Sequence, residues 1–193
     1  MAFDDVLSQM GMHADGTTRT ATRPPVTEAT AELDLAEAFR GTTRLVDIGG
    51  KRLEVTIPKG VDNGSRVKLT GKGQAGGDLV VVVKVRPDPT FTRRGADLER
   101  ELPLSLEEAL LGGEVPVATL KGKVVLTIPA GTQNGRTFRL AGQGMPRLRA
   151  DGSGDLYVRT RVVLPTALDD EAKASARRFL DRVNQPDPRT TRT

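Results

Sequence analysis

The chain has 193 residues, and 29 lysines and arginines against 25 aspartates and glutamates give it a net charge of +4. It contains no cysteine, which excludes disulfides, thiolate nucleophiles and cysteine-ligated zinc sites. No apolar stretch reaches the roughly 20 residues that a membrane-spanning helix needs, and residues 1–12 lack the features of a signal peptide, so we expect a cytoplasmic protein.

Residues 1–27 are rich in threonine, arginine, aspartate and glycine and include a Pro24-Pro25 pair. Such a composition with little hydrophobic periodicity predicts a flexible linker. The single histidine, His13, lies in this segment. A flexible segment cannot hold a histidine in place as a general base, so we do not expect a catalytic role for it.

Residues 28–95 have the alternating pattern of β-strands and form the first predicted β unit. Glu37 lies in the first turn of a short helical segment, residues 35–40, which ends at Gly41. Gly49 and Gly50 predict a tight turn between two strands. The strands expected here are residues 45–48, 53–57, 67–69 and 79–85.

The same pattern returns 71 residues later and predicts a second β unit, residues 96–165. Residues 57–73 and 128–144 are identical at eight of seventeen positions. Six residues, 145–150, are inserted in the second copy, because Asp78 matches Asp155 at an offset of 77. We therefore expect a mainly β fold of two tandem, similar, β-sandwich-like subdomains with short helical turns.

A helix follows over residues 166–184, and residues 185–193 are expected to be a disordered tail. Either Thr166 or Asp169 can be its N-cap. The apolar face of this helix needs a cover, which is either a second copy of the chain or the second β unit. The residues expected on that face are Leu168, Ala172, Ala176, Phe179 and Val183.

Three features that resemble catalytic or ligand sites have simpler interpretations. Residues 71–76 match a G-x-G-x-x-G motif but precede a strand instead of a helix, so their glycines belong to a turn. Residues 151–155 begin like a calcium loop whose later ligands are missing. Glu37 and Glu108 occupy equivalent repeat positions and are expected to cap local turns. We predict no enzyme activity, no metal site and no cofactor.

Several ordered motifs resemble the C-terminal substrate-binding region of DnaJ-type co-chaperones over about residues 28–183. The sequence contains neither the His-Pro-Asp motif of a J-domain nor C-x-x-C repeats, so it is similar to the zinc-free class, close to curved-DNA-binding-protein-like co-chaperones. The motifs are residues 35–41, Ile57-Pro58-x-Gly60, Gly71-x-Gly73 with Gly77-Asp78-Leu79, Pro87-x-Pro89-x-Phe91, residues 102–109, Gly142-x-Gly144-Met145-Pro146 and Gly154-Asp155-Leu156.

The resemblance implies a homodimer that binds unfolded polypeptides and presents them to a DnaK-type chaperone, with the last helix as the dimerisation element. Arg44 and Lys51 match basic positions that hold the acidic tail of the partner chaperone in some members. Three of the implied groove residues, Val46, Ile48 and Val81, are alternatively ordinary core residues of a thin sheet. The implied client groove consists of Ala29, Ala31, Leu33, Val46, Ile48 and Val81.

The rival function is DNA binding through the basic surface, as in the curved-DNA-binding relatives. However, the basic residues are scattered among acidic ones, and one tyrosine with no tryptophan leaves few stacking platforms for bases. Salt dependence separates the two functions, because phosphate contacts weaken steeply as salt rises.

Overall fold

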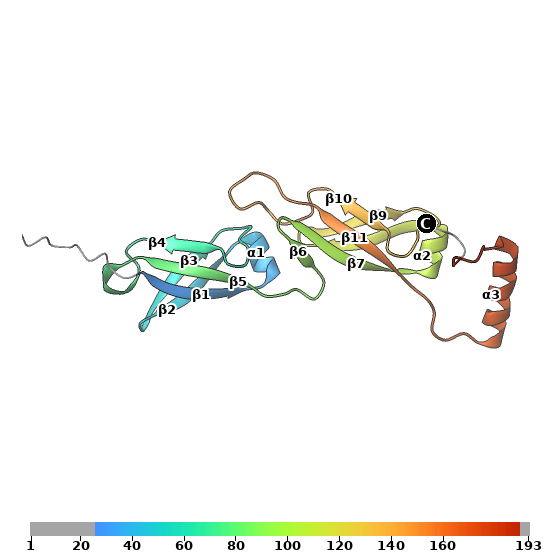
Figure 1. Ribbon diagram of the computed structural model, residues 1–193, viewed down its shortest axis with the longest axis horizontal. Helices are drawn as coiled ribbons and strands as arrows, with labels where there is room; N and C mark the ends of the chain where they lie inside the picture. Colours follow the sequence, from blue (N-terminus) through green and yellow to red (C-terminus); the bar gives the residue numbers. More distant parts are fainter. Residues whose placement is uncertain (1–25, 190–193) are drawn as a thin grey trace, which may run out of the picture.

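Both β units follow one order of elements, strand, short helix, hairpin and two further strands, and a helix follows the second unit (Figure 1). The computed structural model describes residues 26–189, so His13 and nearly all of the predicted linker lie outside the described residues. The first unit contains β1 Thr27–Leu33, α1 Leu35–Arg40, β2 Thr42–Ile48, β3 Lys51–Ile57, β4 Arg66–Leu69, the 3₁₀ helix η3 Gln74–Gly76 and β5 Leu79–Val85. The second contains β6 Thr92–Arg94, β7 Asp97–Ser105, α2 Leu106–Leu111, β8 Gly113–Thr119, β9 Gly122–Ile128, β10 Thr137–Leu140 and β11 Leu156–Val163, and α3 spans Asp170–Val183.

Each unit packs a larger sheet against a two-stranded hairpin, which confirms the predicted mainly β fold. The first unit has the sheet order β1-β5-β4 and the hairpin β2-β3, and the second has β10-β11-β7-β6 and β8-β9. The strand registers agree between the units. Thr27 lies opposite Leu79 in the parallel pair β1–β5, and Leu98 lies opposite Leu156 in the parallel pair β7–β11. The repeat in the sequence is therefore a repeat of structure, residue by residue.

Strand β6 has no counterpart among the described residues of the first unit. It covers residues 92–94, which the sequence assigned to the first β unit, but it pairs with β7 in the second sheet. The boundary expected between residues 95 and 96 therefore lies earlier in the structure. A strand of three residues is too short to show periodicity, which explains the difference.

Alternate side chains of the strands point inward and form the core. In β1, Ala31 and Leu33 are buried while Glu32 between them is exposed, and β3 buries Val55 and Ile57 in the same way. Aliphatic side chains make up most of this core, as the low aromatic content predicts.

Capping boxes begin both short helices. The Asp34 carboxylate accepts a hydrogen bond from the backbone N–H of Glu37, whose side chain in turn accepts one from the N–H of Asp34. Ser105 and Glu108 make the same pair of bonds at α2. The interpretation of the two equivalent glutamates as local caps is thus confirmed.

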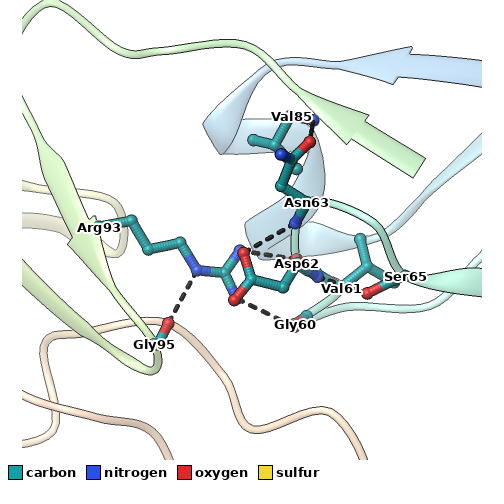
Figure 2. Close-up of polar contacts among 8 residues, drawn as sticks. All are labelled: Gly60, Val61, Asp62, Asn63, Ser65, Val85, Arg93 and Gly95. Atoms are coloured by element: carbon teal, nitrogen blue, oxygen red, sulfur yellow. Dashed lines mark hydrogen bonds and ion pairs between the residues drawn. The ribbon is translucent and has the colours of Figure 1, made fainter.

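Arg93 of β6 joins the two units (Figure 2). Its guanidinium donates hydrogen bonds to the backbone oxygens of Val61 at 2.6 Å and Gly60 at 3.2 Å, and its Nε donates to the oxygen of Gly95 at 2.8 Å. Desolvation lowers the pKa of Arg93, and the carboxylate of Asp62, 3.7 Å away, opposes that change. An arginine begins so far above neutral pH that it stays charged.

The inserted segment, residues 145–150, makes the second contact between the units. Met145 is fully buried in the second unit, and the chain beyond it passes directly over Gly60 of the first. A Cβ atom on Gly60 would lie 2.5 Å from the backbone oxygen of Pro146, so only glycine allows this approach. Arg93 and the insertion together form the joint between the units.

Helix α3 lies beyond the second unit at one end of the elongated molecule (Figure 1). Asp169 is its N-cap, which decides between the two candidates, and Asn184 ends it in the left-handed conformation. Leu168 precedes the cap and so lies outside the helix, which corrects its expected place on the helix face. Within residues 26–189, no helix is long and apolar enough to cross a membrane.

Candidate functional site

The edge where β1 faces β2 in the first unit is open. Within the described residues, β1 pairs only with β5, and β2 pairs only with β3. The two strands nevertheless lie next to each other, so each presents an unpaired side toward the gap. We call these facing sides of β1 and β2 the open edge. Unpaired backbone N–H and C=O groups at such an edge can pair with an added strand.

The six predicted groove residues divide into two groups. Leu33 and Val81 are fully buried, and Ala31 and Val46 are nearly so, at 4% and 8% exposure. These four are part of the core in the described structure. Ala29 on β1 and Ile48 on β2 are only partly buried and lie at the margin of that core. The accessible part of the predicted set is therefore at the open edge.

A depression lies beside Ile48 at the tip of the β2–β3 hairpin. Its lining includes the partly buried Ile48 and Leu53 and the loop of residues 71–76. Lys51, Arg52 and Lys72 also line it. Within the described residues, none of these three cations pairs with a carboxylate, so the depression combines apolar side chains with positive charge. Sequence reasoning selected Lys51 but missed its neighbour Arg52, and it missed Lys72, which comes close only when the loop of residues 71–76 folds over the hairpin.

Arg44, the second basic residue selected from the sequence, has a different environment. Its guanidinium pairs with the Glu37 carboxylate on α1, and its Nε is buried without a hydrogen-bond partner in the described structure. The other carboxylate oxygen of Glu37 belongs to the capping box. Arg44 therefore braces α1 against β2, and its charge is already compensated.

The predicted apolar face of α3 is exposed to solvent. None of the helix residues is buried, and Phe179 and Val183 are 46% and 50% exposed. Ala172 and Ala176 lie on the same face by spacing. Leu180, which the sequence reasoning missed, is 48% exposed and extends this face. The sequence left open whether a second copy of the chain or the second β unit covers the apolar face of α3. Packing of α3 against the second β unit is not observed in the described structure.

Comparison with known proteins agrees with this architecture. A family model described as "DnaJ C terminal domain" matches residues 27–165. The chain is 47% identical over 143 residues to proteins named "Chaperone protein DnaJ" from Bacillus cereus (strain B4264) and Bacillus anthracis (strain A0248). The match covers 71% of this chain and 38% of each relative, so the chain spans well under half the length of those proteins.

Proposed function

The chain belongs to the DnaJ C-terminal domain family, and on that premise we propose that its first β unit binds extended segments of non-native polypeptides for a DnaK-type chaperone. The observation that carries the proposal is the open edge of β1 and β2. A client segment added there forms main-chain hydrogen bonds regardless of its sequence, and the partly exposed Ala29 and Ile48 offer shallow apolar contact. Such binding is weak and sequence-tolerant, as a general chaperone requires.

The positive depression beside Ile48 is proposed to receive the acidic tail of the partner chaperone. Lys51 keeps the role that the resemblance implied, and Arg52 and Lys72, which form no ion pair within the described residues, join it. Arg44 is left out of this proposal because it already pairs with Glu37.

The apolar face of α3 is proposed to form the homodimer. Its three large apolar side chains, Phe179, Leu180 and Val183, are each close to half exposed. A two-fold pairing of α3 covers both copies of this face at once. Two client-binding units on one dimer then hold one long client at two points, which raises its apparent affinity through effective concentration.

The decisive test of the groove is Ile48→Asp in the full chain. A charge at the rim of an apolar groove is partly desolvated by a bound client, so we expect about tenfold or greater loss of affinity, equivalent to about 1.4 kcal/mol. Fluorescence anisotropy with labelled, reduced and carboxymethylated α-lactalbumin measures this. The matched control is Val125→Asp, because Val125 lies on the second hairpin and is 65% exposed.

Equal binding by Ile48→Asp and the parent chain, with unchanged circular dichroism, contradicts the groove. The same titration at several salt concentrations tests the DNA-binding alternative. Apolar capture depends weakly on salt, whereas binding of a DNA duplex through phosphate contacts falls steeply. Steep salt dependence with DNA and no binding of the unfolded protein favour the alternative.

A further inference from the structure

The repeat allows each residue of the open edge to be compared with its counterpart in the second unit. Ala29 lies opposite Val81 in the β1–β5 pair, and Arg100 lies opposite Val158 in the β7–β11 pair. Ala29 and Arg100 are therefore equivalent in structure as well as in sequence, where they are 71 residues apart. By the same offset, Leu45 on β2 corresponds to Pro116 on β8.

Arg100 spans the gap that is open in the first unit. It lies on the inward face of β7, between the buried Leu98 and Leu102. Its Nη1 donates a hydrogen bond of 2.5 Å to the backbone oxygen of Ala118 on β8. The guanidinium also lies 5.4 Å from the centre of the Phe91 ring, which holds it by a cation–π contact. Ala29 has only a methyl group at this place and cannot reach β2.

Pro116 removes a hydrogen-bond donor from the same edge. Thr119 pairs with Gly122 across a two-residue turn, and in such a hairpin the last pair exchanges both hydrogen bonds. Alternation along β8 then directs the backbone groups of Pro116 and Ala118 away from β9, toward the gap. A proline at this position leaves the hairpin ladder intact while it deprives the free edge of an N–H group.

The first unit has neither of these obstacles. Leu45 retains its outward backbone N–H, and its side chain is 68% exposed. Asp47, the counterpart of Ala118, has no arginine across the gap, since Ala29 stands opposite. One edge is thus prepared for strand addition and its copy is blocked at two points.

We propose that Arg100 and Pro116 confine client segments to the first unit by closing the equivalent edge of the second. This inference rests on the proposed function, since it assumes that clients bind by strand addition. It makes Ala29 and Leu45 the residues that determine which unit binds. It also means that the edge between β7 and β8 has the same backbone geometry as the open edge of β1 and β2, and would bind a client segment if Arg100 and Pro116 were replaced.

The test exchanges these residues between the units in the full chain. Arg100→Ala with Pro116→Leu opens the second edge, and Leu45→Pro blocks the first. Because the Leu45 side chain is exposed, Leu45→Pro leaves the inward face of β2 unchanged and tests the edge without altering the core. Hydrogen exchange measured by mass spectrometry, with and without a soluble peptide of alternating leucine and threonine, reports protection of β2 and β8 separately.

In the parent chain we expect the peptide to protect β2 and not β8. The opened variant gains protection at β8, and Leu45→Pro loses it at β2 with affinity reduced about tenfold or more. Protection of β8 in the parent chain overturns the proposal, as does an opened variant that protects only β2. If β8 of the opened variant is protected while β2 never is, the proposed client site is wrong but edge blocking stands. No protection in any variant contradicts both.

Discussion

Arg93 is the residue on which the joint between the two units most depends. Its side chain is only 12% exposed, and it donates to two backbone oxygens of the first unit from a strand of the second sheet. Removing it leaves those two oxygens without their charged donor. Because hydrogen bonds to charged groups stabilise by about 1.5–3 kcal/mol, Arg93→Ala should lower the free energy of unfolding by a similar amount.

Urea denaturation followed by circular dichroism measures this loss. Its control is Arg94→Ala, which removes the neighbouring arginine on the same strand. The side chain of Arg94 is 70% exposed and makes a surface ion pair with Glu99, so its loss should cost less than about 1 kcal/mol. Equal effects of the two variants would mean that Arg93 does not brace the joint.

The sequence could not distinguish these two arginines. Both belong to a set of 29 basic residues, and the first-unit partners of Arg93 lie more than thirty positions earlier in the chain. In contrast, the roles of Glu37 and Glu108 were predictable, because a capping box is local and its residues are three positions apart. The role of Arg100 was partly predictable from the sequence. Alignment of the two repeats already sets it against Ala29, but only the structure shows that it crosses to β8.

Among the elements, α3 has the clearest pattern, and none of its residues is buried. Its 3.6-residue period predicted the helix and its apolar face, whereas the exact start required the observed cap at Asp169. Short elements were less predictable. Strand β6 has three residues, and its place in the second sheet depends on pairing with β7, which no local pattern shows.

Truncation of the chain after Pro165 tests α3 directly. No residue of α3 is buried, so the β units should keep their stability when it is removed. The three large side chains are about half exposed, so full burial by a partner contributes about half of the roughly 1.5–3 kcal/mol of each, on both copies, which favours a dimer. We expect a dimer for the full chain and a folded monomer for the truncated one, by multi-angle light scattering. Equal masses per chain for the two proteins would exclude α3 as the dimer interface.

At the scale of the whole molecule, the spacing of the proposed client-binding units depends on the joint. Pro87 and Pro89 stiffen the chain between the two units, and Arg93 and the inserted segment 145–150 add contacts across the joint. These contacts make the two β units of each chain one stiff arm. In the proposed α3 dimer, that stiffness limits the distance between the two proposed grooves, and avidity for a client is greatest when the client's own length matches that distance.

Gly60→Ala should loosen this joint. At Gly60 the backbone φ is +85°, and an added Cβ would lie 2.5 Å from the backbone oxygen of Pro146. Its repeat counterpart, Gly131, has a φ of +74° but no atom within 4 Å of an added Cβ. Both alanine variants bear the left-handed backbone penalty of about 1–2 kcal/mol, so any further difference between them reports the contact with the insertion.

The angle between the units can be followed with one spin label in each. The chain has no cysteine, so Glu54→Cys and Val125→Cys, at equivalent exposed positions of β3 and β9, give unique attachment sites. In the chain truncated after Pro165, we expect Gly60→Ala to broaden the label-to-label distance distribution and Gly131→Ala to leave it as in the parent. If both variants keep the narrow distribution, then Arg93 and the prolines hold the arm without the insertion. If both broaden it, the strain is not specific to the joint.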